Sequence, residues 1–586
     1  MSTLTVNADS VLAIEIGSIN TRAVLFDVVE NRYRFLGAGN ALTTAGAPFH
    51  DIMAGVREAI SQLEQATGRT LIGVDDRLIL PVQADGSGVD RCVATMSAGA
   101  PMRVVAVGLL EDVSAQSAQN LANTTYAQVV EVLSLNDRRS TAARLDAVLR
   151  ARPDVIIMAG GAEGGASRSV MKLVEAVGLA CYVTPKEQRP PVLFAGNQSL
   201  AKPIRDELAA YASVYIAPNI RPAIETEQLL AAQTQLAEVY RQNRKRHIAG
   251  VDVIESWTNG HLLSSAMTFG RTIRFIGNEY AKTRKGVLGV DVGGSNTTLA
   301  AAFGDNLKLH VNARLGIGEN LPGLLAHSAV DEIIRWSHME LSEETVRDFI
   351  YNKAAYPASL PVTNEELALE HLLTSQIIQV ALKKIMRSFP SEAFRAGAGL
   401  LPWFEPIIAS GSVLTQAPSR GQTAMTLLNA LQPTGVTTLA LDQNNLAPMI
   451  GAASSVAPIL TVQALDATNF INLGTVISPI GQAQPGVPIL RVRVMFNDGS
   501  ETTHDIKYGA LDIINLPAGQ SATLHLHPLH RFDVGMGGAG RSGSVKVIGG
   551  MLGLIIDARG RPINLPADPG RRRDLIKKWH WTLGAA

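Results

Sequence analysis

A short stretch occurs twice in this chain in similar form, and this repeat constrains the fold more than any other feature. The first copy, Ser10–Asp27, reads SVLAIEIGSINTRAVLFD, and the second, Gly286–Asp305, reads GVLGVDVGGSNTTLAAAFGD. Each copy has an apolar run, a turn rich in Gly, Ser and Asn, and a second apolar run, which is the pattern of two buried strands joined by a tight turn. We therefore expect two related hairpins.

Each predicted turn carries a carboxylate followed two residues later by a glycine. Glycine lets the backbone approach a ligand closely, and the N–H groups of such a turn can converge on an anion. The carboxylates of Glu15 and Asp291 could hold the water shell of a Mg²⁺ ion. The turns therefore predict a polyphosphate site, with these binding residues: Gly17, Ser18, Asn20 and Thr21 in the first copy, and Gly293, Gly294, Ser295, Asn296 and Thr297 in the second.

A third turn follows another buried strand, in Pro406–Ser412, which reads PIIASGS. The two hairpins and this turn, in this order, resemble the phosphate and adenosine elements of the actin, Hsp70 and sugar kinase ATPase superfamily. That resemblance implies an α/β protein with a duplicated, two-lobed actin-like ATPase (ASKHA) fold. It also implies ATP and Mg²⁺ as cofactors, with the adenosine contacted by Ser410, Gly411 and Ser412. Asp291 would then orient the metal or an attacking water, with Glu15 completing the metal shell.

Longer segments sharpen the resemblance to a family. They are CVATMSAGAPMRVVAVGLLEDVSAQSA from Cys92, PDVIIMAGGAEGGAS from Pro153, VLFAGNQ from Val192, LPGLL from Leu321 and Arg347–Glu370. Over roughly residues 10 to 460 they resemble the glutamate mutase L family, accessory proteins usually found with adenosylcobalamin-dependent mutases. This resemblance implies a chaperone-like protein that assembles, activates or reactivates a cobalamin-dependent mutase subunit through nucleotide-gated lobe closure. ATP hydrolysis would accompany that change if the chain is an ATPase.

Two departures from the family pattern leave other functions open. Family members usually have Asp where this chain has Glu15, and the second hairpin usually continues Thr-Thr-Asp where Leu299 stands here. A longer carboxylate disturbs an octahedral Mg²⁺ shell, which tolerates little error. A non-hydrolysing scaffold that retains the ATPase fold is therefore the alternative. A small-molecule kinase is a third possibility, which would need a general base that the sequence does not identify.

Glycines also cluster at Gly160–Gly165, between a predicted strand and a predicted helix. This layout could bind an anion, with Glu163 as a catalytic group that positions water. Close packing of the helix on the strand would explain the glycines equally well. Further on, the chain alternates apolar and polar residues from Leu490 to Phe496, which indicates strands. We expect a first lobe over 8–284, a second lobe with helical insertions over 285–460, and a C-terminal β-rich domain over 461–586.

Composition narrows the partners and the compartment. Lys plus Arg and Asp plus Glu number 52 each, so bulk charge predicts no nucleic-acid partner. The two cysteines lack metal-ligand spacing, and no segment reads as a signal peptide or a membrane span, so we expect a cytoplasmic protein. A homo-oligomer is possible. His525, His527 and His530 are interpreted as surface histidines, with a metal site as the alternative.

Overall fold

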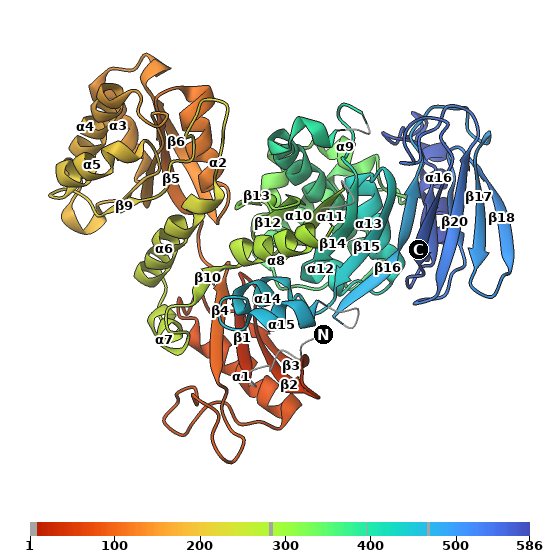
Figure 1. The fold of residues 1–586 in the computed structure, drawn as a ribbon, viewed down its shortest axis with the longest axis horizontal. Coiled ribbons are helices and arrows are strands. Elements are labelled where there is room, and N and C mark those ends of the chain that lie inside the picture. Colours follow the sequence, from red (N-terminus) through yellow and green to blue (C-terminus); the bar gives the residue numbers. More distant parts are fainter. Residues whose placement is uncertain (1–8, 281–284, 395–396, 466–468, 586) are drawn as a thin grey trace. The chain divides into compact units, whose positions relative to one another are not determined.

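The computed structural model describes residues 9–280, 285–394, 397–465 and 469–585 (Figure 1). The predicted domain limits at residues 8, 284 and 586 lie outside the described residues. Contacts divide the chain into two compact units. Unit 1 takes the chain up to Thr268 with two short later segments, Leu309–Arg314 and Ala452–Ile459. Unit 2 takes the intervening segments and the C-terminal part.

The first sheet of unit 1 is built on the first predicted hairpin. Its strand order is β10-β4-β1-β2-β3, where β1 pairs antiparallel with β2 and parallel with β4. Helix α1 (Met53–Thr67) packs on β2 and β3, because Val56, Ile60 and Leu63 recur on one helical face and are buried. The bounds are β1 (Val11–Ile16), β2 (Asn20–Val29), β3 (Arg32–Leu42), β4 (Arg91–Met96), β10 (Leu262–Ser264) and the nearby helix α7 (Val251–Trp257).

The second sheet of unit 1 lies between β4 and β10 in the sequence, as an insertion. Its five strands are parallel and ordered β6-β5-β7-β8-β9, so the first strand of the insertion stands second in the sheet. Apolar clusters cover both faces, as expected for a doubly wound parallel sheet. The bounds are β5 (Met102–Gly108), β6 (Ala127–Ser134), β7 (Val155–Met158), β8 (Val192–Phe194), β9 (Val214–Ile216), α2 (Gln116–Ala122), α3 (Thr141–Ala151), α4 (Ser167–Val183), α5 (Ala201–Leu208) and α6 (Leu230–His247).

An eight-stranded sheet contains the second predicted hairpin, and its strands belong to unit 2 except for the second half of β13. The order is β13-β12-β11-β14-β15-β16-β22-β19. Strand β11 pairs antiparallel with β12 and parallel with β14, so its environment repeats that of β1. The bounds are β11 (Gly286–Val292), β12 (Thr297–Phe303), β13 (Asn306–Asn312), β14 (Phe404–Ser410), β15 (Gly435–Asp442), β16 (Phe470–Ser478), β19 (Leu511–Ile514) and β22 (Leu554–Asp557).

Helices α9 to α13 and α16 contribute residues to the largest apolar cluster of unit 2. The longest of them, α11, starts with a capping box in which Thr363 and Glu366 exchange hydrogen bonds. Helix α13 packs against both α11 and α16. The bounds are α8 (Ser265–Glu279), α9 (Val330–Ile334), α10 (Glu343–Ala355), α11 (Asn364–Ile385), α12 (Ser412–Thr415), α13 (Arg420–Leu431), α14 (Ala447–Ala453), α15 (Pro458–Ala464) and α16 (Pro569–Leu583).

The C-terminal part is rich in strands, and it also completes the large sheet. Four antiparallel strands form a sheet in the order β18-β17-β20-β21, which are β17 (Pro488–Phe496), β18 (Glu501–Lys507), β20 (Ser521–Pro528) and β21 (Gly543–Ile548). Strands β16, β19 and β22 instead extend the eight-stranded sheet, and the apolar runs of β16 and β22 are mostly buried. The predicted α/β class with repeated hairpins and a β-rich C-terminal part is confirmed.

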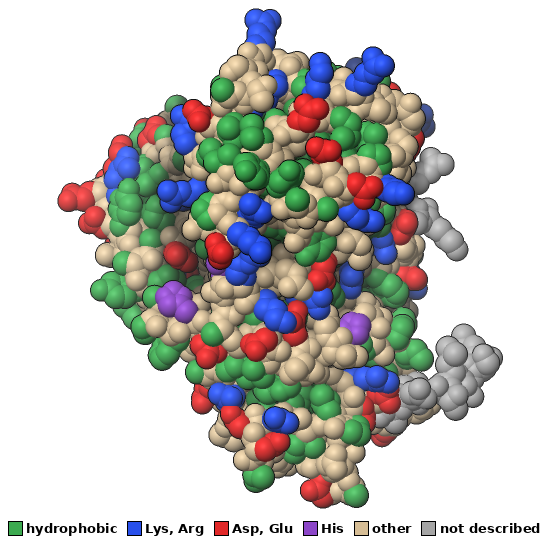
Figure 2. Space-filling view, turned by 90° about the vertical axis from the view of Figure 1, so that its left-hand side faces the viewer, with side chains coloured by type: hydrophobic (Ala, Val, Ile, Leu, Met, Phe, Trp, Pro, Cys, Tyr) green, Lys and Arg blue, Asp and Glu red, His purple; other side chains and the backbone are tan. Residues whose placement is uncertain are grey.

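The surface and the helices bear on the partners expected from composition. On the face drawn in Figure 2, acidic and basic side chains are intermixed, in agreement with the formal net charge of +0. A search of the described helices finds none that is long and apolar enough to cross a membrane.

Candidate functional site

The hairpin of β11 and β12 ends in the glycine turn that the sequence predicts. The pairing aligns Asp291 with Thr298 and Val292 with Thr297. The turn is closed by a hydrogen bond of 2.9 Å from the Gly293 amide to the Asn296 carbonyl. Gly293 and Gly294 are half-buried, so their backbone is the accessible part of the turn.

A second loop holds this turn in place. The amides of Ile317 and Gly318 donate to the carbonyls of Gly293 and Gly294 at 3.0 and 2.7 Å. A Cβ added to Gly316 would come within 2.5 Å of the Asn296 nitrogen, so only glycine fits there. These two bonds of the loop therefore use carbonyl oxygens of the turn and not its N–H groups.

The polar side chains of this turn face the protein more than solvent. The Thr297 hydroxyl is fully buried and donates to the Leu315 carbonyl at 2.8 Å. The amide of Asn320 donates to the Ser295 carbonyl at 2.7 Å, and Ser295 and Asn296 are buried. Thr297 therefore holds the hairpin, and backbone groups are the better candidates for phosphate contacts.

Asp291 stands beside two hydroxyl residues on one face of the sheet. It pairs with Thr298 across the hairpin and with Ser410 on the adjacent strand β14. Directly paired residues place their side chains on the same face of a sheet. The Thr298 hydroxyl is buried and has no hydrogen-bond partner among the described residues. A carboxylate next to an unpaired hydroxyl is an oxygen-donor set of the type that Mg²⁺ prefers.

The turn after β14 lies directly against this hairpin. Gly411 has a φ of 99°, and a Cβ added there would collide with the carbonyl of Val292. The Ser410 hydroxyl faces Asp442 Oδ2 at 3.1 Å and Asn445 Oδ1 at 3.0 Å. Ser412 is exposed and begins helix α12. Ser410 therefore fixes the turn, Gly411 is buried within it, and Ser412 is its exposed residue.

The sequence reasoning missed two residues that shape this turn. Asp442 is fully buried and accepts hydrogen bonds from the Leu446 and Ala447 amides at 2.7 and 2.9 Å. Asn445 Oδ1 accepts from the Gly411 amide at 2.7 Å. The available signal was the segment LDQNNLAP, in which acid and amide residues follow a buried strand.

The first hairpin repeats the backbone geometry with a different charge arrangement. The Gly17 amide donates to the Asn20 carbonyl at 2.9 Å, as in the second hairpin. Glu15 pairs with Arg22 across the strands, and Arg22 Nη1 lies 3.8 Å from Glu15 Oε2. Arg22 Nε also donates to Asn40 Oδ1 at 2.6 Å. A guanidinium therefore lies beside the carboxylate that the sequence assigned to Mg²⁺.

The remaining polar residues of the first turn differ in exposure. Thr21 is fully buried, and its hydroxyl lies 3.3 Å from that of Thr43. The Thr43 amide donates to the Ile19 carbonyl, so β3 holds this turn. Ser18 is half-buried and Asn20 is exposed. Ser18 and Asn20 are thus the accessible side chains here.

Glu163 lies in the other sheet of unit 1, in the glycine-rich loop after β7. Its carboxylate accepts hydrogen bonds from Asn219 Nδ2 at 2.7 Å and from the Gln198 amide at 3.3 Å. A Cβ added to Gly196 would clash with the Gly160 backbone. These contacts tie together the loops after β7, β8 and β9, which favours the packing interpretation of the cluster.

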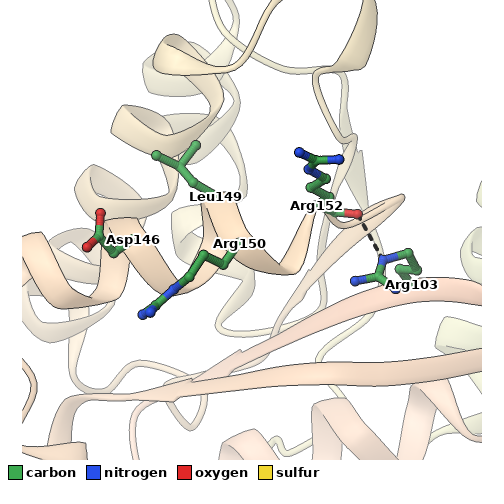
Figure 3. A pocket seen from close by; sticks show the side chains of 5 residues that line it. All are labelled: Arg103, Asp146, Leu149, Arg150 and Arg152. Atoms are coloured by element: carbon green, nitrogen blue, oxygen red, sulfur yellow. Dashed lines mark hydrogen bonds between the residues drawn. The ribbon is translucent and has the colours of Figure 1, made fainter.

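A shallow cavity of about 680 Å³ lies at the C-terminal end of α3 (Figure 3). Arg150 and Arg152 are exposed on its rim. Arg103 Nη2 donates to the Ala151 carbonyl at 2.7 Å, and its Nε lies 3.3 Å from the Arg152 carbonyl, the dashed line in Figure 3. Cations at a helix C-terminus stabilise its carbonyls, so this cluster has a structural explanation.

The structure gathers only part of the predicted site set. Asp291, the turn 293–297 and the turn 410–412 share one edge of the unit 2 sheet. Glu15 and the turn 17–21 belong to the first sheet of unit 1, and Glu163 to the second. Within the described ranges no three His, Cys, Asp or Glu side chains are grouped to hold a metal. His525 and His527 lie instead against Ser544 and Ser542.

Fold and site together define an α/β protein that carries two related strand-turn-strand hairpins, each closed by a glycine turn. The family described as MutL protein matches residues 11–468. The chain therefore belongs to that family, the glutamate mutase L family.

One curated relative and two solved structures are similar to the chain. Protein MutL of Clostridium tetanomorphum is 23% identical over 312 residues, which are 52% of this chain and 61% of that protein. The alignment thus spans less than two thirds of that relative. ATP-dependent caprolactamase from Pseudomonas jessenii is 11% identical, with a TM-score of 0.33 over 85% of this chain and 81% of the other. (R)-2-hydroxyglutaryl-CoA dehydratase component A from Acidaminococcus fermentans is 8% identical, with a TM-score of 0.26 over 76% and 96%. Likeness at these TM-scores carries no functional inference.

Proposed function

We propose that this chain is a nucleotide-binding accessory protein that assembles, activates or reactivates a cobalamin-dependent mutase. The observation that carries the proposal is the edge of the unit 2 sheet, where Asp291, the glycine turn and the Gly411 turn lie together. Membership of the glutamate mutase L family supports the choice of partner, because proteins of that family usually accompany such mutases.

The nucleotide in this proposal is ATP with Mg²⁺. The backbone of Gly293 and Gly294, with the N–H groups of the turn, would bind phosphate oxygens. Asp291 would hold the metal through water. The neighbouring Thr298 hydroxyl, which has no partner among the described residues, would hydrogen-bond to a water of the same hydration shell. Gly411 and Ser412 would contact the adenosine. Bound Mg²⁺ would neutralise phosphate charge there.

Glu15 takes a different role in this proposal. Its neighbour Arg22 already balances its charge, so a metal would have to displace the guanidinium. The first hairpin would therefore use the backbone of Gly17 with Ser18 and Asn20, and Glu15 would orient Arg22. Nucleotide occupancy would bias a conformational equilibrium that a bound mutase subunit reads.

The test is calorimetric titration of the full chain with ATP and Mg²⁺, comparing Asp291→Asn with Glu15→Gln. Losing one charge-assisted interaction costs about 1.5–3 kcal/mol, so Asp291→Asn should weaken Mg²⁺-dependent binding by about tenfold or more. Glu15→Gln should change it by less than about threefold, because its carboxylate serves Arg22. Equal losses in both variants would contradict the assignment.

A non-hydrolysing scaffold is the second candidate, and the Glu15–Arg22 pair favours it. A carboxylate held by arginine is not prepared for metal-assisted chemistry. Phosphate release separates the two: release that Asp291→Asn abolishes would make the chain an ATPase. Binding without release would leave a nucleotide-gated scaffold. An ATP concentration of about 5 mM is far above the usual range of nucleotide affinities. If it produced no heat and no thermal shift, the proposal that this chain binds a nucleotide would be contradicted.

A further inference from the structure

Unit 2 contains a partly open cavity that the nucleotide proposal does not use. Its volume is about 510 Å³, within the range of small-molecule sites. Helices α11, α13 and α16 contribute its walls, and the segment 336–340 closes one side. The contacts of α13 with both other helices place these walls in one packed group.

Flat side chains form much of the wall. The imidazole rings of His338 and His580 lie tilted with centroids 4.4 Å apart. Trp336 and Trp581 also line the cavity, and Trp581 is 70% exposed. Aromatic surfaces of this kind pack favourably against another ring, face to face or edge to face.

Two nearly buried polar side chains lie in this wall. Ser375 is 3% exposed, and its hydroxyl has no hydrogen bond among the described residues. Asn429 is 8% exposed, and its Oδ1 accepts from Arg559 Nη1 at 2.7 Å. Because Oδ1 is engaged by Arg559, Nδ2 is the donor that Asn429 can offer to a ligand. Buried polar groups are rarely left unsatisfied, so the Ser375 hydroxyl indicates a missing partner.

His371 adds a ring nitrogen that has no partner among the described residues. Its Nδ1 lies 3.2 Å from the Thr426 hydroxyl, which itself donates to the Gln422 carbonyl at 2.9 Å. A hydroxyl has one proton, so when Thr426 donates to the Gln422 carbonyl, Nδ1 of His371 carries the proton of the ring. Nε2 is then a lone-pair acceptor, and it is buried without a partner in the described chain. A ligand N–H would satisfy it.

The charges around the cavity favour a neutral occupant. Burial lowers the pKa of His371 to about 4 and that of His580 to about 3, so both rings are neutral near pH 7. Burial and Lys577 lower the pKa of His338 as well. The guanidinium of Arg559 is paired with Asp557 at 2.8 Å. Lys577 and Glu340, the exposed lining charges, have opposite signs.

We propose that this cavity, which we call the three-helix pocket, binds a small neutral aromatic or heteroaromatic molecule that carries adjacent hydrogen-bond donor and acceptor groups. The ring would pack among His338, His580 and Trp336. A donor of the ligand would reach His371 Nε2, and an acceptor would take Asn429 Nδ2. The Ser375 hydroxyl can accept from a donor of the ligand or donate to an acceptor. The probe below contains no phosphate, so its binding is independent of the nucleotide proposal.

The probe is benzamide, which joins a flat ring to an amide donor and acceptor, and its control is cyclohexanecarboxamide, which keeps the amide without the ring face. Saturation-transfer NMR with the full chain should detect benzamide at about 10 mM, the concentration range of fragment binding. Cyclohexanecarboxamide should bind about fivefold more weakly, the equivalent of about 1 kcal/mol of ring packing.

His371→Phe keeps a ring and removes Nε2, so it should weaken benzamide about fivefold, as for one lost hydrogen bond. His504→Phe, on β18 and outside the three-helix pocket, is the matched control and should leave binding unchanged. If thermal unfolding shows that His371→Phe does not fold, Ser375→Ala replaces it. No transfer to benzamide, equal binding of the two amides, or unchanged binding in the folded pocket variant would each overturn the proposal.

Discussion

Arg22 and Thr298 hold equivalent positions in the two hairpins, and this difference changes the surroundings of the carboxylate. Each stands across the strand pair from the carboxylate, Glu15 or Asp291. Arginine is permanently charged and compensates its neighbour, whereas threonine leaves the carboxylate next to a neutral hydroxyl. The two turns have the same backbone closure, so the assignment of metal binding depends on these residues and not on the glycines.

Gly411 is the residue at which the candidate site is most sensitive to a small change. Gly411→Ala introduces a left-handed alanine and a collision with the Val292 carbonyl, so it should cost about 2–5 kcal/mol and abolish nucleotide binding. Gly486→Ala has a similar φ of 89° with open space around it and should cost only about 1–2 kcal/mol. Urea denaturation measures the loss of unfolding free energy in both variants. Equal losses would show that the structure around Gly411 accommodates the added methyl group without further cost.

Local patterns predicted the elements well, and long-range partners account for what was missed. Both hairpins and the Gly411 turn follow from glycine and apolar spacing, which the chain displays within a few residues. Arg22 was overlooked because its position opposite Glu15 appears only when the strand register is known. The predicted roles of Ser410 and Thr297 in ligand binding remain predictions, and their hydroxyls face Asp442 and Leu315 instead of solvent.

At the scale of elements, α13 packs against the C-terminal end of α16 within unit 2. A Cβ added to Gly421 would overlap the Leu583 carbonyl. The Ser419 hydroxyl, which caps α13, donates to the Gly584 carbonyl at 2.7 Å. The N-terminal end of α13 therefore contacts the C-terminal end of α16 through a closely packed glycine and a hydrogen bond.

Gly421→Ala should push α16 away from α13 at a cost of about 1–3 kcal/mol and expose its basic residues to trypsin. Gly570→Ala, at the other end of α16, meets nothing closer than 3.4 Å and should stabilise the helix by up to about 1 kcal/mol. Limited proteolysis with mass spectrometry measures the rate of trypsin cleavage in α16 for both variants. Cleavage within residues 569–585 at the wild-type rate in Gly421→Ala would contradict the contact.

At the scale of the molecule, the buried histidines link the stability of unit 2 to pH. His371 and His580 have pKa values lowered by burial to about 4 and about 3, whereas an unfolded histidine titrates near 6.5. Below pH 6.5 the unfolded state therefore binds more protons than the folded state. The free energy of unfolding should fall by about 2–4 kcal/mol between pH 7 and pH 5.

Tryptophan fluorescence during urea unfolding measures this effect, because Trp336, Trp403, Trp579 and Trp581 lie in unit 2 and only Trp257 lies in unit 1. His371→Phe should reduce the dependence on pH by about half, since it removes one of the two strongly shifted groups. A free energy of unfolding that stays constant from pH 7 to pH 5 would contradict the buried, neutral state of these rings.

The insertion in unit 1 fixes an order of events during synthesis. Strand β10 pairs with β4, yet the entire doubly wound sheet separates them along the chain. At 5–20 residues per second, the ribosome needs on the order of 10 s to make this insertion. During that interval β4 has an open edge, which is a site for mispairing. An insertion that folds rapidly would bring β10 close to β4 before another strand pairs with the open edge of β4.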